Sequence, residues 1–319
     1  MAKTKIEADH GLNVRMFITG LAMVALYAII VSVMLSLGVS MVLVIVIAAA
    51  LIFSQYYFSD KIAMFAMHAH EVTPQQEPKL HEIVDRLCLL ADMAKPRVGV
   101  SEMDMPNAFA TGRNPNHAVI CATRGLMSRL NDEELEAVLA HELSHVAHRD
   151  VAVMTIASGL GMIAGLLTRV MFYSEIFGGG GRGRSNNSGG QLAMIELIVM
   201  LVSIVVYFVS FMLTMALSRY RELAADRSGA ILIGQPSQLA SALIKISGEM
   251  GRVPTKDLRA AEPFNAFFFV PALTGQGAQD QQRRQGDGFS FGSLFRTHPT
   301  LERRLAQLDQ LEHELGQAR

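Results

Sequence analysis

The stretch "VLAHELSHVAHRD", residues 138–150, places a glutamate between two histidines just before a long apolar run. On a helix, His141 and His145 project from one face, one turn apart, and Glu142 lies beside them. Two imidazoles bind zinc and leave other positions open, and the carboxylate can take a proton from water on the same metal. The motif arises by chance in roughly one or two of a hundred such chains. It therefore indicates a zinc peptidase only if a third ligand exists.

The third ligand has to come from elsewhere in the chain, because catalytic zinc is held by three protein side chains. The pattern with a third histidine after a glycine is absent, since residues 148–151 read "HRDV". The stretch "SRYRELAADRSGA" instead offers Glu222, with Asp226 one helical turn later. We predict that Glu222 is a ligand and that Asp226 hydrogen-bonds a ligand histidine and fixes its tautomer. The predicted site binds one Zn²⁺ per chain.

The composition indicates a protein that lies partly in lipid. Half of the 319 residues are apolar and only 18% are charged, against about a quarter in soluble domains. Four apolar runs each approach the roughly 20 residues that a helix needs to cross the hydrocarbon. They cover residues 16–37, 39–53, 151–173 and 192–217. The net charge is −1 and there is no basic block, so a nucleic-acid partner is not expected.

Basic residues near the ends of the apolar runs predict the orientation of the chain. With a cytosolic N-terminus, the cytosolic side holds Lys3, Lys5, Arg15, Lys61, Arg149, Arg219, Arg221 and Arg227. The two loops on the far side hold only Arg182 and Arg184. This imbalance predicts that both long polar parts of the chain face the cytosol.

The predicted fold is mainly α-helical with a small β-sheet, in an integral membrane protein with four transmembrane helices and a cytosolic zinc protease domain. The short runs "RVGVSEM", "NAFATG" and "HAVICAT" predict the sheet. Asn131 and Glu134 predict a capped start for the helix that carries the histidines. The predicted units are an N-terminal transmembrane hairpin (1–57), the first part of the protease domain (58–150), a second transmembrane hairpin (151–217) with a glycine-rich loop (174–191), and the second part of the protease domain (218–319).

Four motifs follow one another along the chain: "PNAFATG", "HELSHVAHRD", "RELAADR" and "THPTLERRL". Together they resemble the HtpX family of bacterial membrane zinc metalloproteases, relatives of the CAAX prenyl proteases. The resemblance runs through nearly the whole chain and implies a zincin-like (gluzincin) domain. In it His141, His145 and Glu222 bind zinc and Glu142 is the general base.

The same resemblance implies where the protein works and on what. It implies a multi-pass protein of the bacterial inner (cytoplasmic) membrane with its active site facing the cytosol. There it would hydrolyse damaged or misfolded membrane proteins, as part of quality control and the stress response. The expected partners are membrane-protein or unfolded polypeptide substrates and the lipid bilayer.

Two of the motifs gain predicted roles from the resemblance. The run "PNAFATG" would be an edge strand beside the zinc, where Asn107 and Ala108 contact an extended substrate; the alternative is a plain core strand. His298 would stabilise the developing oxyanion. Alternatively, because Pro299 follows it, His298 only caps a helix that carries Arg304.

Three other functions are weighed against this one. A CAAX-type processing protease shares the chemistry, but those relatives carry more spans than the four predicted here. A non-catalytic scaffold stapled by zinc would use four protein ligands, often thiolates, whereas Cys88 and Cys121 lie far from the motif in apolar surroundings typical of reduced core thiols. A transporter would show charges in mid-span or repeated halves. Arg169 lies inside the third run, and no repeat is visible.

Overall fold

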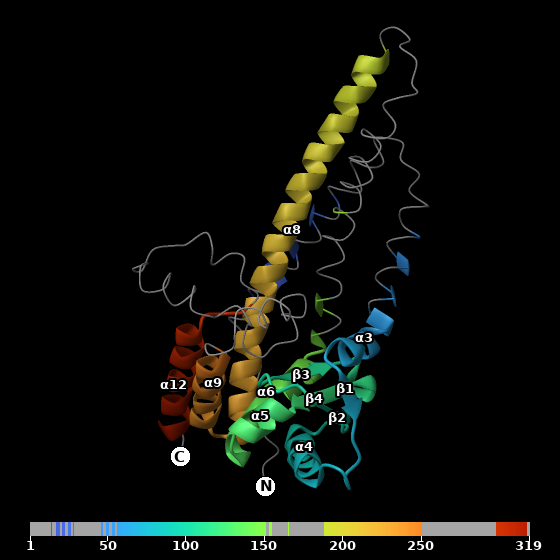
Figure 1. Cartoon of the computed structure of the whole chain (residues 1–319). Coiled ribbons are helices and arrows are strands. Elements are labelled where there is room, and N and C mark those ends of the chain that lie inside the picture. Colours follow the sequence, from blue (N-terminus) through green and yellow to red (C-terminus); the bar gives the residue numbers. More distant parts are fainter. Residues whose placement is uncertain are drawn as a thin grey trace.

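Figure 1 shows a computed structural model of the chain. It describes residues 56–150, 188–250 and 298–317, with scattered positions among residues 14–54 and 153–165. The described helices are α3 (Ser59–Ala66), α4 (Pro78–Ala91), α5 (Arg124–Arg129), α6 (Asp132–Ala147), α8 (Ser188–Ile233), α9 (Pro236–Met250) and α12 (Leu301–Gln317). The strands are β1 (Ala69–Glu71), β2 (Arg97–Ser101), β3 (Ala108–Thr111) and β4 (Val119–Thr123). The prediction of a mainly helical chain with a small sheet is confirmed.

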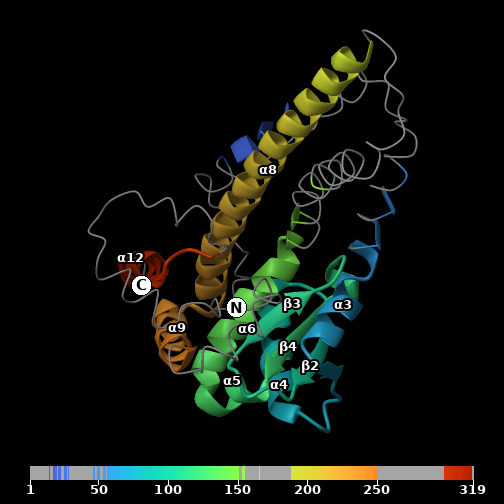
Figure 2. The same ribbon diagram turned by 45° about the horizontal axis from the view of Figure 1, so that its top comes forward.

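The sheet is mixed and its strands lie in the order β1-β2-β4-β3. The central pair β2 and β4 is parallel, and both outer pairs are antiparallel. The three runs predicted as strands form β2, β3 and β4. Strand β1 was not predicted, because three residues are too few to show an alternating pattern. Strand β3 is therefore an edge strand, on the side of the sheet toward which α8 extends (Figures 1 and 2).

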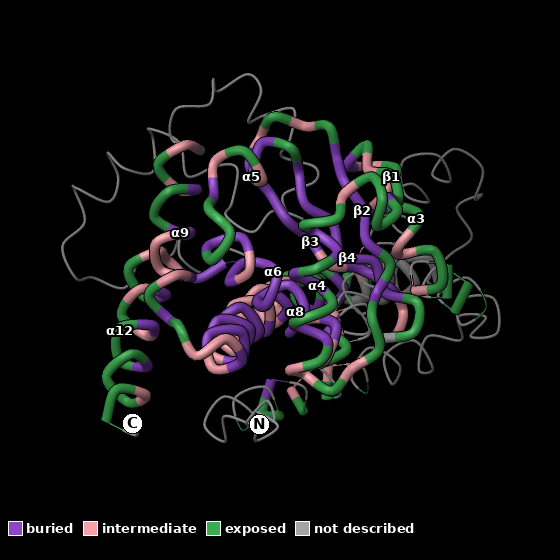
Figure 3. Tube along the Cα trace, turned by 90° about the horizontal axis from the view of Figure 1, so that it is seen from below, coloured by how far each residue is buried: buried purple, intermediate pink, exposed green. Residues whose placement is uncertain are grey.

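Helix α6 lies at the centre of the domain, in contact with β3 and β4 on one side and with α8 and α9 on the other (Figure 2). Eleven of its sixteen residues are buried, which explains why its sequence lacks a polar face. Its start is capped as predicted: the Asn131 side chain accepts from the backbone N–H of Glu134, and the Glu134 side chain accepts from the backbone N–H of Asn131. In Figure 3 the buried trace concentrates on α6, the adjoining part of α8 and the central strands.

Glu134 also fastens α6 to α9. Its buried carboxylate accepts hydrogen bonds from the Ser241 hydroxyl at 2.6 Å and from the Lys245 ammonium at 2.7 Å. Burial alone would raise the pKa of Glu134, but these hydrogen bonds and that from Asn131 outweigh it and lower the pKa. The helix that carries the histidines is thus held at its N-terminal end by an ionised carboxylate.

Helix α8 joins the predicted fourth span to the protease domain without a break. It has 46 residues, about 70 Å of helix, so it extends well beyond the roughly 30 Å hydrocarbon core. Met200–Ile233 is long and apolar enough to cross a membrane, and only 28% of its most apolar window is buried. Many large apolar side chains of α8 are exposed: Met194, Leu197, Ile198, Leu201, Ile204, Val205, Tyr207 and Phe208.

Helix α8 extends beyond the fourth apolar run, 192–217, at both ends. Helix α8 begins at Ser188, inside the predicted loop 174–191, and it runs through the predicted boundary between residues 217 and 218. The larger parts of the predicted spans 16–37, 39–53 and 151–173 lie outside the described residues. Among the described residues, one helix is long and apolar enough to span a membrane.

Candidate metal centre

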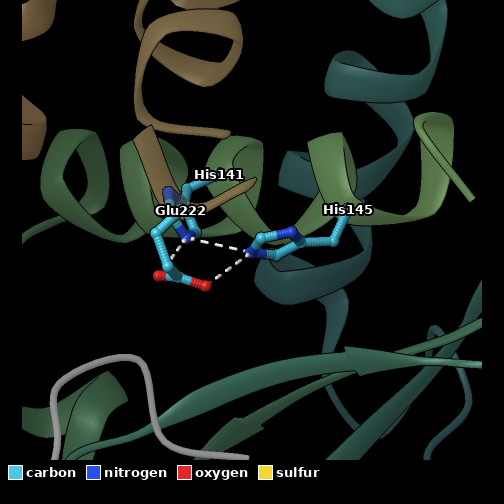
Figure 4. Close-up of side chains that lie close together, drawn as sticks. All are labelled: His141, His145 and Glu222. Atoms are coloured by element: carbon cyan, nitrogen blue, oxygen red, sulfur yellow. Dashed lines mark hydrogen bonds and ion pairs between the residues drawn. The ribbon is translucent and has the colours of Figure 1, made fainter. Parts of the chain in front are cut away.

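Three side chains from two helices converge on one point (Figure 4). His141 and His145 come from α6 and Glu222 comes from α8. The two Nε2 atoms are 3.2 Å apart, and the Glu222 oxygens lie 3.7 Å from His141 Nε2 and 3.6 Å from His145 Nε2. One ligand atom from each residue can be chosen so that all lie within 4.8 Å of one another. The structure therefore brings together the three side chains that the sequence proposed as ligands.

These distances fit a zinc ion. Tetrahedral zinc with bonds of 2.0–2.1 Å places its ligand atoms about 3.3 Å apart, close to the separations found here. The histidine nitrogens that face each other are also both lone-pair acceptors when the other ring nitrogen carries the proton. Two acceptors at 3.2 Å beside a carboxylate repel one another unless a cation or a proton lies between them. The donor set and its spacing thus match the metal that the sequence predicts.

Each ligand histidine meets a carboxylate at its other nitrogen. His141 Nδ1 lies 2.9 Å from Asp226 Oδ1, the arrangement predicted for Asp226. His145 Nδ1 donates to Asp150 Oδ2 at 2.6 Å. Both carboxylates are buried, and a hydrogen bond at Nδ1 leaves Nε2 free to bind a metal. The role of Asp150 was not predicted, although the residue stands in the quoted motif.

Two buried arginines stand behind these carboxylates. Arg304 of α12 binds Asp226 through both oxygens, with Nε to Oδ2 at 2.7 Å and the NH2 nitrogen to Oδ1 at 2.6 Å. Arg221 of α8 lies 2.6 Å from Asp150 Oδ2. Burial alone would raise the pKa of each aspartate, but the adjacent arginine and histidine outweigh it and lower the pKa. Both aspartates are therefore ionised at neutral pH.

The ligand side chains carry strongly shifted pKa values. Burial lowers the pKa of His141 and outweighs the effect of Asp226. Burial also disfavours the charged form of His145, but the hydrogen bond and charge of Asp150 and the nearby glutamates raise its pKa to about 9. Burial would raise the pKa of Glu222, yet His298 and the two ligand histidines hold it well below its usual range. A proton and a metal ion would thus compete for the Nε2 atom of His145.

Glu142 lies beside the metal ligands and against the edge strand. Its side chain is buried, and burial raises its pKa to about 8, although the charge of His145 and a hydrogen bond from the backbone of Ala110 oppose this. A cation in the site would add a further charge that favours the carboxylate. The residue is therefore placed and tuned as a group that exchanges a proton near neutral pH.

His298 contacts a proposed metal ligand. Its Nδ1 lies 3.1 Å from Glu222 Oε2, and its side chain is buried. The cap of α12 is provided by Thr300, whose hydroxyl accepts from the backbone N–H of Arg303 at 3.4 Å. The contact with Glu222 favours the prediction that places His298 at the site over the alternative in which His298 only caps this helix.

The edge strand β3 has one side that pairs with no other strand of the described sheet. Asn107 uses both backbone groups on Thr123: its N–H donates to the threonine hydroxyl and its C=O accepts from the threonine N–H, each at 2.9 Å. Because bonded and non-bonded residues alternate in an antiparallel pair, the backbone groups of Ala108 and Ala110 face the free edge. The backbone of Asn107 is thus occupied within the sheet, whereas that of Ala108 faces the unpaired edge of β3, with Ala108 itself buried; Ala110 was not predicted.

A small open pocket adjoins this edge. Residues 110–112 of the β3 segment line one side, and His145 and Val146 of α6 line the other. Asn114, Arg149 and Asp150 complete the lining. A side chain of an extended peptide that lies along β3 would therefore meet a pocket beside the metal ligands.

Comparison with known proteins identifies the family. The family described as Peptidase family M48 matches residues 74–312 of the chain. The chain belongs to peptidase family M48. Within it, Protease HtpX homolog 1 of Streptomyces coelicolor is 52% identical over 99% of this chain and 98% of its own length. The Protease HtpX homolog of Moorella thermoacetica is 49% identical, over 99% and 100% respectively.

This M48 chain is thus a metalloprotease of the HtpX group, a family of membrane proteases, which confirms the enzyme class predicted from the two histidines. Protease HtpX homolog 2 of Methanosarcina acetivorans is 47% identical over 98% of the chain and 100% of its own length. The crystal structure of S. mikatae Ste24p is a weaker match, with a TM-score of 0.49 and 17% identity over 94% of this chain and 67% of that one.

Proposed function

We propose that the protein is a zinc endopeptidase that hydrolyses damaged or misfolded membrane proteins at the cytosolic face of the membrane. The observation that carries this proposal is the pair of Nε2 atoms 3.2 Å apart, with the Glu222 carboxylate beside both. His141, His145 and Glu222 would hold one Zn²⁺, with Asp226 orienting His141. When bound, zinc supplies Lewis acidity to the attacking water and to the peptide carbonyl.

The remaining chemistry falls to groups of the protein. Glu142 accepts the proton of the attacking water and passes it to the leaving amine, a task suited to a pKa near neutrality. His298, which lies against Glu222, is the proposed stabiliser of the developing oxyanion. No covalent intermediate with a protein side chain is required.

An extended polypeptide is the substrate that the edge strand favours. The backbone groups of Ala108 and the carbonyl of Ala110 face the unpaired edge of β3, where a substrate strand would add to the sheet. A peptide held there passes Glu142, which bonds to Ala110, and then reaches the metal ligands. Folded segments cannot pair in this way, so unfolded or misassembled polypeptides are the expected substrates.

The proposed setting is the inner membrane of a bacterium. Four transmembrane helices in two hairpins (1–57 and 151–217, the second with its tip at 174–191) would place the two parts of the protease domain (58–150 and 218–319) in the cytosol. The apolar, exposed surface of α8 supports one of these spans. The excess of basic residues on the side of the protease domain supports the cytosolic orientation.

Two alternatives lead to different expectations. A CAAX-type processing protease would cleave prenylated C-terminal peptides and spare internal loops of membrane proteins. A zinc-stapled scaffold would need a closed coordination shell. Against the scaffold, Cys88 and Cys121 are buried in the domain core as free thiols, and among the described residues three ligand side chains converge rather than four.

The proposal is tested by measuring zinc content and cleavage of a labelled unfolded polypeptide on the same purified samples. We expect about one zinc per chain in the wild type and in Glu142→Ala, with cleavage lost in Glu142→Ala. Glu222→Ala should lose both zinc and cleavage. Glu133→Ala, an exposed residue of the same helix α6, serves as the matched control. Normal cleavage by Glu142→Ala would show that the assigned mechanism is wrong.

A further inference from the structure

The carboxylates of Asp226 and Asp150, which contact the two proposed ligand histidines, bind their arginines in different ways. Asp226 uses both oxygens on Arg304, so that ion pair is bidentate. Asp150 instead uses a single oxygen, Oδ2, which receives both His145 Nδ1 and Arg221 at 2.6 Å. Within the described part of the chain, Asp150 Oδ1 and Arg221 Nε have no hydrogen-bond partner. The pair of Asp150 and Arg221 thus leaves one polar atom of each side chain without a hydrogen bond, but it places an Asp150 oxygen against His145 Nδ1.

Stability does not explain a pair of this kind. Removing two charges from water costs several kcal/mol per ion in proteins, and only good geometry with all hydrogen bonds made repays the cost. Both side chains are nearly inaccessible, with Asp150 at 3% and Arg221 at 8% exposure. One polar atom of each has no described partner, so well-packed apolar residues would serve the fold as well or better.

The backbone conformation just before Asp150 also indicates that Asp150 is placed for its contact with His145. Helix α6 ends at Ala147, and the N–H groups of His148 and Arg149 still bond back to Ser144 and Val146. Arg149 then adopts φ 55°, a left-handed conformation that costs a non-glycine residue about 1–3 kcal/mol. This turn brings Asp150 back onto His145, five residues earlier. The strained turn at Arg149 thus places the Asp150 carboxylate against the proposed ligand His145.

We propose that Asp150 is a positioning residue for His145 and that Arg221 anchors Asp150 in that role. Asp150 holds the proton on Nδ1, so that the Nε2 lone pair faces the metal position. Arg221 precedes Glu222 on α8, so one helix supplies both a metal ligand and the anchor of the group that orients another. The inference rests on the proposed zinc site and deepens it.

The test measures the zinc dissociation constant of the full-length protein in detergent, by competition with a chromophoric chelator. Asp150→Ala is expected to weaken zinc binding about 10–100-fold. Asp150→Asn keeps an oxygen that can accept from Nδ1, so it should recover part of this loss. Arg221→Gln should have a smaller effect than Asp150→Ala. The double variant should match Asp150→Ala, because Arg221 acts through Asp150.

Two further readouts separate positioning from a structural role. The visible spectrum of the Co²⁺-substituted protein should change in Asp150→Ala, because the ligand field at His145 changes. The unfolding temperature of each metal-free variant is measured beside it, so that a loss of zinc binding is told apart from a loss of stability of the fold. Asp85→Ala removes an aspartate of an exposed ion pair with Lys95 and should leave all readouts unchanged.

The outcomes distinguish this inference from the proposed function. If Glu222→Ala loses zinc while Asp150→Ala and Asp150→Asn bind it within about threefold of wild type, the positioning role is refuted and the zinc site stands. If Glu222→Ala keeps its zinc, the proposed ligand set itself fails. If Asp150→Ala does not fold, Asp150→Asn and Arg221→Gln decide by the same measurement.

Discussion

Gly229 offers a direct test of how the metal centre is assembled. The residue lies on α8, and a Cβ built there would meet the backbone of α6, at 2.8 Å from His141 N and 3.0 Å from Ala140 C. Glu222 lies seven residues earlier, which is two helical turns and about the same face of α8. The absence of a side chain at Gly229 thus permits the close approach that brings Glu222 to His141.

The effect of Gly229→Ala follows from these distances. Ordinary van der Waals contact begins at 3.4 Å, so the backbones must separate by about 0.6 Å to accept a methyl group 2.8 Å away. Ligand positions tolerate only about 0.2 Å, and we expect zinc to bind about tenfold or more weakly. Overpacking costs about 1–3 kcal/mol, while alanine gains about 1 kcal/mol over glycine in a helix. The net loss of stability is therefore about 0–2 kcal/mol, similar in size to a tenfold loss of zinc affinity, so the two are measured separately.

The assay combines chelator competition for zinc with thermal unfolding of the metal-free protein. Gly248→Ala is the matched control, because it lies in helix α9 and its added methyl group would meet nothing within 4 Å. It should raise stability by about 1 kcal/mol and leave zinc binding unchanged. Equal zinc affinities for the two variants would show that the contact at Gly229 does not set the geometry of the site.

Three other predictions concern the supports of the site. Glu134→Gln should destabilise the protein by about 1–3 kcal/mol at pH 7. Because the folded pKa of Glu134 is lowered, its contribution is present above the unfolded pKa and lost as the pH falls through the folded one, so urea unfolding at pH 3 should show a smaller difference. Arg304→Met leaves the buried charge of Asp226 without its arginine and should cost about 3–5 kcal/mol in thermal unfolding, whereas the exposed Arg303→Met should be nearly neutral. Burial raises the pKa of Cys121, so a thiol reagent should label it only after unfolding.

Much of the candidate site follows from spacing in the sequence. His141 and His145 lie one turn apart because a helix repeats every 3.6 residues, and Asn131 with Glu134 marks where that helix begins. Glu222 was found because a third ligand was required and a glutamate follows the fourth apolar run. These inferences need only local periodicity and the chemistry of one metal.

The supports of the site could not be predicted in the same way. Asp150 reaches His145 through a turn at Arg149 with positive φ, and no glycine marks that turn in the sequence. Arg304 and Asp226 are 78 residues apart in the sequence, and the periodicity of a helix or strand does not predict a contact over such a separation. Asn107 was assigned to the substrate, but the register of β3 against β4 turns its backbone toward Thr123. Register and long-range contacts depend on the whole fold.

Helix α8 carries three determinants of the metal site on a continuation of an apolar helix. Glu222 is the proposed third ligand, Asp226 lies against His141, and Gly229 sets the approach of α8 to α6. Glu222 lies only five residues beyond the end of the predicted span, Leu217, with no break between them. An uninterrupted helix transmits a change of tilt along its axis, and membrane helices tilt to match the thickness of the bilayer. The separation of Glu222 from His141 therefore depends on both the small contact at Gly229 and the membrane around α8.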